Sequence, residues 1–229
     1  MNFGPLIMSA EMALAYREGR KTETRRVIAH LPGHGRISDF GASESRGYSW
    51  RFRTSDGGWD WLTHSALLEL ADHLPGDGFW LREPIYHCQA SWSTNAAHAA
   101  YRSDGSGTGK LWRWKPNSLG GRYMPKVLCR TLGECLEVRV ERVQDIDDAG
   151  AIAEGITGDG GQWATFCTGD AAYKSTPRLA YSYLWDSLHG KKPGERFEDN
   201  PWVYVYCLSE PITTDYATAQ AILGEGETQ

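Results

Sequence analysis

The sequence predicts an α+β fold in which short helices interrupt a mostly antiparallel sheet that is closed or half-closed. Three observations lead to this prediction. Strand-like segments are interrupted by short helical ones, regular β-α-β alternation is missing, and neither an internal repeat nor a domain linker is visible. With 41% hydrophobic residues and ten tryptophans among 229 residues, the chain can bury a sizeable core. We therefore expect a single domain over residues 1–210, followed by an acidic tail at 211–229 that is weakly helical at best.

The N-terminal part is expected to form a strand, a short helix and a second strand. Residues 4–8 have the apolar character of a short buried strand. Ser9 has the side chain of an N-cap, and Gly19 is suited to end the helix that begins there. Residues 22–28 contain Thr, Val and Ile, which favour extended backbone.

A first insertion is expected at about residues 29–70. The part from 29 to 58 is rich in Gly, Ser, Arg and His, which predicts irregular structure, while the tryptophans between 50 and 61 predict a small hairpin. His30 and His34 have the spacing of a helical metal pair, but Pro32 lies between them. We therefore expect no metal site here.

A second irregular insertion is expected at about residues 87–122. Trp112 and Trp114 alternate there with Arg113 and Lys115. Such a pattern fits bases stacked on the indole rings with phosphates on the cations. It fits equally a strand that packs one face on the core.

The remaining elements follow from alternation and capping signals. Asp147 is expected to cap a helix that Gly155 ends, and Pro177 to begin another that ends at Gly190. Further expected elements are a helix at 65–73, strands at 79–83, 124–130, 132–143 and 200–208, and a loop at 158–176.

The charge of the chain is unevenly distributed. The net charge of −5 argues against a protein that coats nucleic acid. Residues 102–142 nevertheless hold nine Lys and Arg against four Asp and Glu, whereas residues 143–229 hold five against fourteen. The basic segment suits contact with phosphates. The alternative is that the two segments face each other or simply solvate the surface.

Cysteine usage and hydropathy indicate a cytoplasmic protein. The five cysteines form no Cys-x-x-Cys pair, which fits buried reduced thiols. No apolar run approaches the ~20 residues that span a membrane, and the N-terminus lacks the features of a secretion signal.

The stretch Gly-Arg-Lys-Thr-Glu-Thr-Arg-Arg at 19–26 places an ammonium (Lys21), a hydroxyl (Thr24) and a guanidinium (Arg26) close together. Neighbouring cations make an amine easier to deprotonate, and a neutral lysine can take a proton from a hydroxyl. In an extended strand Thr24 and Arg26 share a face that Lys21 and Arg25 do not. Lys21 therefore reaches Thr24 only if it belongs to the preceding turn. The alternative is a solvated basic turn.

These residues resemble the ASCH domain family, which has a PUA-like β-barrel fold and the motif Gly-x-Lys-x-x-(Thr or Glu)-x-Arg. Gly19, Lys21, Thr24 and Arg26 match all defined positions. The wider pattern is similar to phage and prophage members over roughly residues 5–208. It includes Gly76–Glu83, Tyr101–Asp104, Met124–Pro125, Val138–Ile146, Ala153–Ile156, Leu184–Leu188 and Asn200–Val203.

The resemblance implies an amidohydrolase, because small ASCH members deacylate N4-acylcytidines with a lysine, a threonine and a distant glutamate. The matching residues are Lys21, Thr24 and Glu154. In the implied mechanism, Thr24 attacks the exocyclic amide while Lys21, held by Glu154, acts as base. Arg26 would stabilise the oxyanion. The alternative makes Glu154 the proton acceptor and Lys21 an electrostatic stabiliser. No cofactor is implied.

The resemblance also implies a competing function, a module that binds RNA or modified DNA without chemistry. Arg26, Arg82 and Trp80, with Glu83 as a further substrate-binding candidate, would then hold a base while the basic segment contacts phosphates. A third possibility is a phage accessory protein that acts through protein partners.

Overall fold

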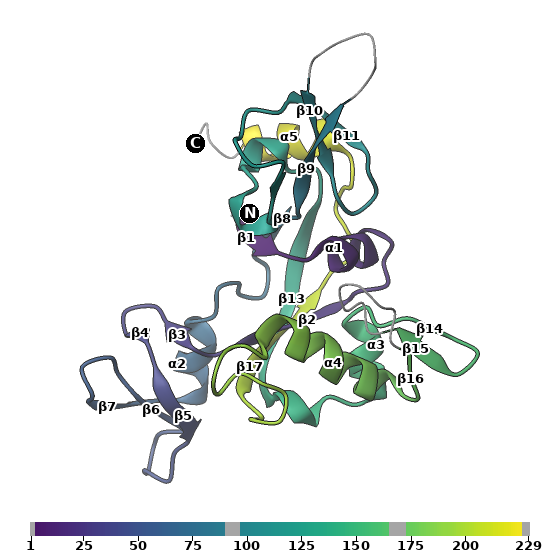
Figure 1. The fold of residues 1–229 in the computed structure, drawn as a ribbon. Coiled ribbons are helices and arrows are strands. Elements are labelled where there is room, and N and C mark those ends of the chain that lie inside the picture. The colour runs from purple at the N-terminus through teal and green to yellow at the C-terminus, as the bar shows by residue number, and fades with distance from the viewer. Residues whose placement is uncertain (1–2, 90–96, 165–172, 226–229) are drawn as a thin grey trace. The chain divides into compact units, whose positions relative to one another are not determined.

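The computed structural model describes residues 3–89, 97–164 and 173–225, which form an α+β fold of mostly strands and a few helices (Figure 1). The sequence predicted a closed or half-closed antiparallel sheet. The described strands instead form several open sheets, and one strand pair is parallel, which its long connection allows.

Two compact units make up the chain. Unit 1 comprises Met1–Thr22, Gly76–Cys135 and Leu208–Gln229, and unit 2 comprises Glu23–Pro75 and Leu136–Cys207. Each is described by itself. The single domain expected over residues 1–210 stays a prediction.

Unit 1 begins with a strand followed by a helix. β1 (Phe3–Ile7) pairs in parallel with β8 (Gly78–Arg82), to which the first residues of β13 (Leu132–Arg142) pair antiparallel. Ser9 caps α1 (Ala10–Arg17) as predicted, since its hydroxyl accepts a hydrogen bond from the Met12 amide at 3.3 Å. Tyr16 of α1 lies 5.5 Å from Phe79 of β8, ring centre to ring centre.

The second predicted insertion is a regular sheet and not an irregular segment. Its four strands have the order β11-β10-β9-β12, all antiparallel. Trp112 and Trp114 pack against the buried core of unit 1, but they lie just after β11 and outside any strand, so the strand of the second interpretation is not formed there. The strands are β9 (Ile85–Gln89), β10 (Ala97–Tyr101), β11 (Gly107–Leu111) and β12 (Ser118–Leu119).

Two further expectations for unit 1 are wrong. Residues 124–130 form no strand: Pro125 caps the 3-10 turn η2 (Lys126–Leu128), which follows η1 (Gly121–Tyr123). The tail is more helical than expected, since it contains α5 (Tyr216–Glu225). Ala219 and Leu223 of α5 are buried in the core of unit 1, so packing stabilises this helix where local propensity is weak.

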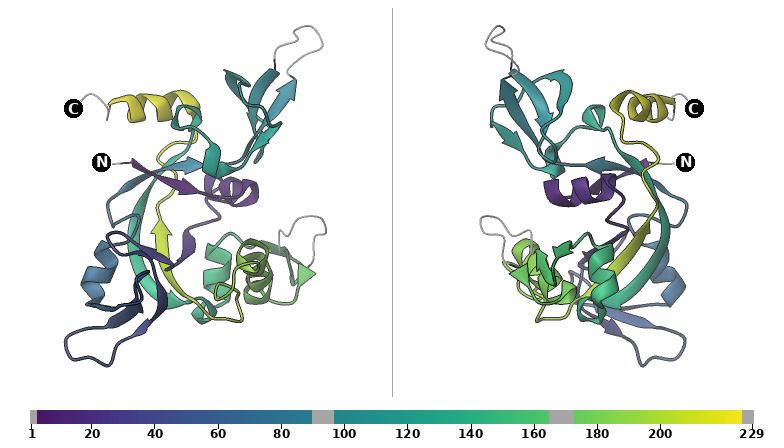
Figure 2. Two further views of the ribbon diagram at one scale, coloured as in Figure 1. Left: turned by 60° about the vertical axis from the view of Figure 1, so that its left-hand side comes forward. Right: turned by 90° about the vertical axis from the view of Figure 1, so that its right-hand side faces the viewer.

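Unit 2 is built on the strand that carries the motif. β2 (Glu23–Val27) pairs antiparallel with β17 (Trp202–Leu208), so that Thr24 lies opposite Tyr206. The later part of β13 is the next strand in the order β13-β17-β2. α3 (Asp148–Ala153) and α4 (Pro177–His189) lie side by side (Figure 2). Asp147 caps α3 and Pro177 begins α4, both as predicted, and the N-cap of α4 is Thr176.

The first predicted insertion lies in unit 2 and contains the expected hairpin. β6 (Trp50–Arg53) pairs with β7 (Trp59–Leu62), but most of the segment expected to be irregular also forms short strands. The expected loop at 158–176 likewise contains strands within its described part. The additional elements are β3 (His30–Leu31), β4 (Gly35–Arg36), β5 (Ser38–Ala42), α2 (His64–Glu69), β14 (Gly158–Asp159), β15 (Gln162–Ala164) and β16 (Tyr173–Lys174).

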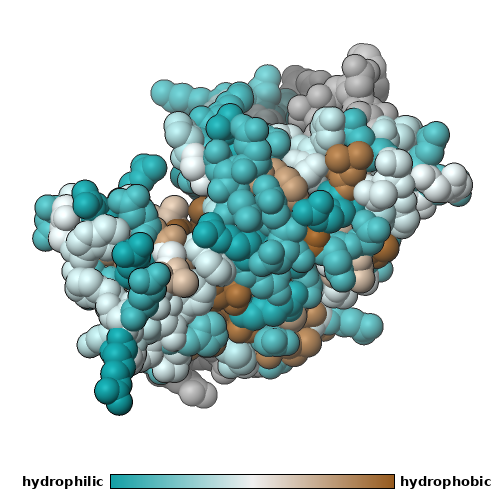
Figure 3. Space-filling model, turned by 90° about the horizontal axis from the view of Figure 1, so that it is seen from below, coloured by the Kyte–Doolittle hydropathy of each residue, from teal (hydrophilic) through white to brown (hydrophobic). Residues whose placement is uncertain are grey.

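The described residues contain neither a membrane-spanning helix nor a disulfide. Among the described helices, none is both long enough and apolar enough to cross a bilayer. Hydrophilic side chains dominate the face shown in Figure 3, where hydrophobic ones form only small separate patches. Cys88, Cys129, Cys135 and Cys207 carry free thiols, and Cys167 lies outside the described residues.

Candidate functional site

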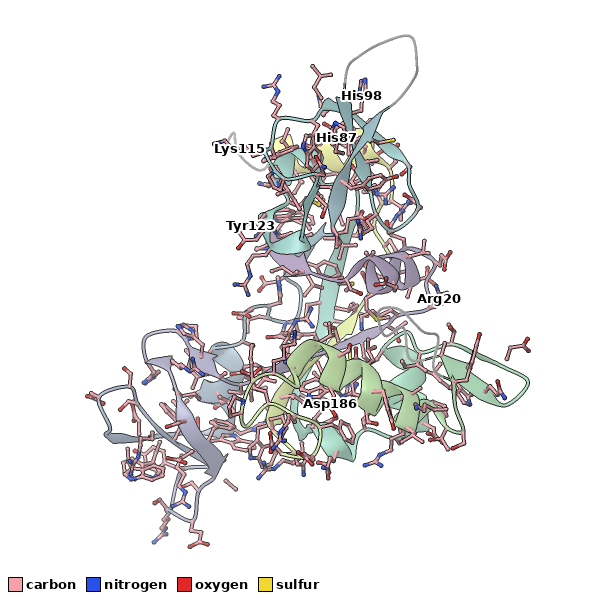
Figure 4. The ribbon with its side chains drawn as sticks, viewed as in Figure 1. Arg20, His87, His98, Lys115, Tyr123 and Asp186 are labelled. Atoms are coloured by element: carbon pink, nitrogen blue, oxygen red, sulfur yellow. The ribbon has the colours of Figure 1, made fainter. Side chains whose placement is uncertain are left out.

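The motif begins in the turn that ends α1. Gly19 has φ +73°, a left-handed conformation that glycine adopts without strain. The amides of Arg20 and Lys21 both donate to the Ala15 carbonyl, at 2.8 and 3.1 Å. Lys21 thus belongs to the turn, which was the condition set from the sequence. Its side chain is 2% exposed, whereas Arg20, labelled in Figure 4, is exposed and pairs with exposed Glu18.

Thr24, Arg25 and Arg26 follow on β2 in unit 2. Thr24 is 2% exposed and Arg25 3% exposed, while Arg26 is half-buried and donates to the Arg25 carbonyl at 3.1 Å. Neighbouring residues of a strand point to opposite faces, so Thr24 and Arg25 serve different sides of β2. Both faces of β2 are therefore covered at this point. Burial of a charged side chain such as Arg25 is unusual.

Arg25 is held by three carboxylates from three elements of unit 2. Its Nη1 lies 3.1 Å from Glu23 Oε2 and 3.3 Å from Glu154 Oε1, and its Nη2 lies 3.3 Å from Glu141 Oε2. Arg139 of β13 extends this network, because its Nη2 lies 2.6 Å from Glu23 Oε1 and its Nε pairs with Glu141. Two guanidiniums therefore face three carboxylates.

Glu154 reaches this cluster because of where α3 ends. Asp147 accepts from the Gly150 amide at 2.7 Å at the start of α3, and Gly155, with φ +97°, follows Glu154 at its end. Glu154 is 5% exposed. Gly150 faces Arg25, since a Cβ placed on it would lie 3.3 Å from Arg25 Nη2. A small residue at 150 thus allows the guanidinium to approach.

Tyr181 of α4 donates its hydroxyl to Glu154, at 3.5 Å from Oε1. Burial and the charge of Glu154 raise the pKa of Tyr181 well above its ordinary value, although Arg25 opposes this. Tyr181 is therefore a neutral donor. Burial alone would lower the pKa of Arg25, but Glu154 and the other anionic neighbours raise it overall. Arg25 is permanently charged.

The other predicted site residues lie in unit 1 and make contacts within that unit. Trp80 is 8% exposed and belongs to the core, with the Arg82 guanidinium 5.3 Å from its ring centre. Arg82 also donates to the Arg122 carbonyl. Glu83 is 1% exposed, and both of its oxygens accept from Arg130, at 2.8 and 3.0 Å.

The described part of the chain thus brings Glu154 to the strand of Thr24 and Arg26, and it places Lys21, Trp80, Arg82 and Glu83 in unit 1. Sequence reasoning missed Arg25 as the partner of Glu154. The sequence did contain a signal. On the predicted strand, Arg25 shares a face with Glu23, opposite to Thr24, and a buried arginine on that face requires carboxylate partners. Among the described residues, no three His, Cys, Asp or Glu side chains are grouped to hold a metal ion.

Comparison with known proteins adds no relative. No family model, no curated protein and no solved structure matches the chain.

Proposed function

We propose that this protein is a nucleoside-directed amidohydrolase that removes the acyl group from N4-acylated cytosine nucleosides. One observation carries the proposal. Glu154, which the resemblance to ASCH domains selects from a distant helix, lies 3.3 Å from Arg25 on β2, the strand that also carries Thr24 on its other face. A buried ionisable cluster around a motif strand is typical of functional sites.

In the proposed reaction Thr24 is the nucleophile and Lys21 the base. The Thr24 hydroxyl oxygen attacks the amide carbonyl carbon and its proton passes to the neutral Lys21 amine. The tetrahedral intermediate collapses, the C–N bond breaks, and the cytosine amino group leaves with that proton. Water then hydrolyses the acyl-threonine, which releases a carboxylic acid and restores the hydroxyl.

Arg25 favours this assignment over the alternative in which Glu154 is the proton acceptor. A guanidinium at 3.3 Å favours the ionised carboxylate and makes it a poorer base. Arg25 also gives Glu154 a permanent counter-charge.

The assay is the ultraviolet change that accompanies conversion of N4-acetylcytidine to cytidine. We expect turnover by the wild-type protein, and loss of at least about 10²-fold in kcat in Thr24→Val and Lys21→Ala, the lower end for a lost acid–base group. Thr22→Val and Arg20→Ala are the controls, because Thr22 is an exposed residue with the same hydroxyl as Thr24, and Arg20 is an exposed cation next to Lys21. No turnover by the wild type, or full turnover by Thr24→Val, would reject the proposal.

We also propose the PUA-like fold that accompanies this activity in the family. The order of the motifs supports it: a helix precedes the Gly-x-Lys-x-x-Thr-x-Arg stretch, and a Gly-Asp turn leads into the Trp-containing β8. An experimental structure with a closed barrel around β2, β13 and β17 is the expected outcome.

The second candidate is a nucleic-acid-binding module. Within residues 102–126 six Lys and Arg stand against the single carboxylate Asp104, and Lys115 and Tyr123, labelled in Figure 4, are exposed. The three other cations of the basic segment make contacts within the protein. They are Arg130, Arg139 and Arg142. Salt-dependent oligonucleotide binding without turnover is the result that would favour this candidate.

A further inference from the structure

The hairpin β6–β7 in unit 2 exposes two tryptophans and two arginines on one face. In its antiparallel register Arg51 lies opposite Trp61, and Arg53 lies opposite Trp59. Residues paired across two strands share a face, so these four side chains lie together. Trp59 is 41% exposed and Trp61 39% exposed, and both arginines are exposed.

The opposite face of the hairpin is buried, which leaves the face with the two arginines and two tryptophans exposed. Trp50 and Phe52 alternate with the two arginines along β6 and are 7% and 0% exposed. Trp50 also stacks on Phe40, with ring centres 5.3 Å apart and an interplanar angle of 13°. Since Trp50 and Phe52 anchor the hairpin, Trp59 and Trp61 are not needed to bury it.

The arginines lie against one indole and are available to a partner. The guanidinium carbons of Arg51 and Arg53 are 5.3 and 5.2 Å from the Trp59 ring centre, within the range of cation–π attraction. Among the described residues, Arg51 has no carboxylate within ion-pair distance. Arg53 pairs with Asp39 at 3.7 Å, but both are largely exposed, and such surface pairs contribute little.

The neighbouring strand leaves the face open. β5 pairs with β6 on the side away from β7, and Gly41 lies opposite Arg51. A Cβ placed on Gly41 would meet no atom within 4 Å. β7 is at the free edge of this three-stranded sheet. Position 41 of β5 therefore leaves the face beside Arg51 uncovered, while Asp39 of β5 reaches the face at Arg53.

We propose that this Trp-Arg face, formed by Arg51, Arg53, Trp59 and Trp61, binds single-stranded nucleic acid. Bases stack on the two indoles and the two guanidiniums hold phosphates, which is the combination that single-strand binders use. Trp59 and Trp61 are two residues apart on a strand, about 6.8 Å. That is about twice the ~3.4 Å rise of a stacked strand, so a stretched strand can place one base on each ring.

Stabilisation of the hairpin is the other role open to these side chains. Cross-strand Trp and Arg pairs strengthen hairpins, and the contacts to Trp59 do so here. Trp61 has no such cation contact, and it remains exposed opposite Arg51. The proposal is independent of the amidohydrolase, since none of the four residues belongs to the cluster around Arg25.

The test is fluorescence anisotropy of labelled twelve-nucleotide oligo(U) and oligo(dT), titrated with the intact protein at 50 to 200 mM salt. We expect both to bind, and Trp59→Leu and Trp61→Leu each to weaken binding by about 5- to 150-fold, as for loss of one stacked base. Arg51→Gln with Arg53→Gln should reduce the salt slope by about 1.4, or 0.7 for each lost phosphate contact. Preference for one oligonucleotide identifies RNA or DNA as the ligand.

The control is Arg113→Gln with Lys115→Gln, which removes two exposed cations from unit 1 and should leave affinity unchanged within about 2-fold. Thermal unfolding of each variant shows that it is folded, and deacylation by each variant should equal that of the wild type. The proposal is overturned if the wild type does not bind at 50 mM salt. It is also overturned if folded Trp59→Leu and Trp61→Leu bind as tightly as the wild type, or if only the unit 1 control loses binding.

Discussion

Arg25 and Glu154 are 129 positions apart in the chain, and their side chains lie 3.3 Å apart. Arg25 is 3% exposed and Glu154 is 5% exposed, so the contact is removed from bulk water. Burial of a charge is costly unless a partner compensates it, and three carboxylates compensate Arg25. The contact therefore fixes α3 on β2 and also sets the charge state of the cluster.

Replacing Arg25 should be strongly destabilising. Arg25→Met leaves Glu154 and two half-buried carboxylates without their shared cation, and loss of one partner of a buried ion pair costs about 3–5 kcal/mol. Denaturant unfolding measures this loss. Arg20→Met is the control, because its ion pair with Glu18 is exposed and should contribute less than about 1 kcal/mol.

The double variant Arg25→Met with Glu154→Gln separates the pair from the rest of the network. If the contact is a real coupling, the double variant loses less stability than the sum of the two single variants. Strict additivity would show that Glu154 is compensated by other groups.

Gly150→Ala should weaken unit 2, although alanine favours helices by about 1 kcal/mol. The added Cβ would lie 3.1 Å from Ile146 Cγ1, 3.2 Å from Asp147 Oδ1 and 3.3 Å from Arg25 Nη2. It would disturb the cap of α3 and the guanidinium together. We expect a net loss of about 1 kcal/mol in the free energy of unfolding. Gly224→Ala in α5 has open space around its Cβ and should be neutral or stabilising. Equal effects of the two substitutions would contradict close packing at Gly150.

Local signals accounted for the elements that frame the candidate site. Ser9 and Asp147 were recognisable caps, and the β2 and β17 strands followed from their Thr, Val and Tyr content. The turn around Pro125 and helix α5 were not recognised. Residues 124–130 contain apolar residues without a strand partner, and α5 depends on burial of Ala219 and Leu223, which is a tertiary effect.

The site was predictable only in part, for a related reason. Thr24 and Glu154 come from short motifs, whereas the contacts of Arg25 depend on which helix covers β2. Glu83 shows the same limit. Its partner Arg130 is 47 positions away in the chain. The sequence alone therefore could not distinguish a buried structural carboxylate from a residue that contacts substrate.

Glu83→Gln should therefore lower stability and leave catalysis intact. Glu83 accepts two hydrogen bonds from Arg130, and bonds to charged groups contribute about 1.5–3 kcal/mol each. We expect a loss of roughly 2 kcal/mol in the free energy of unfolding, with unchanged KM for N4-acetylcytidine in the folded variant. A raised KM with unchanged stability would instead make Glu83 a substrate contact.

Asp104 should make stability depend on pH in the acid range. Partial burial would raise its pKa, but hydrogen bonds from Arg130, Arg17 and Ser106 lower it well below the ordinary value. A carboxylate with a lower pKa in the folded state stabilises the fold above its unfolded pKa of about 3.9. That contribution is lost as pH falls from about 4 towards the lowered folded pKa, where the carboxylate becomes protonated in both states.

The measurement compares wild type with Asp104→Asn by urea unfolding between pH 7 and pH 2. We expect the wild type to be more stable by about 1 kcal/mol at pH 7, a modest value because Asp104 is partly exposed. The difference should shrink below pH 4. Glu44→Gln is the control, since Glu44 is exposed and has no ion-pair partner among the described residues. A difference between wild type and Asp104→Asn that stays constant down to pH 2 would show that the Arg130 and Arg17 contacts do not shift the titration of Asp104.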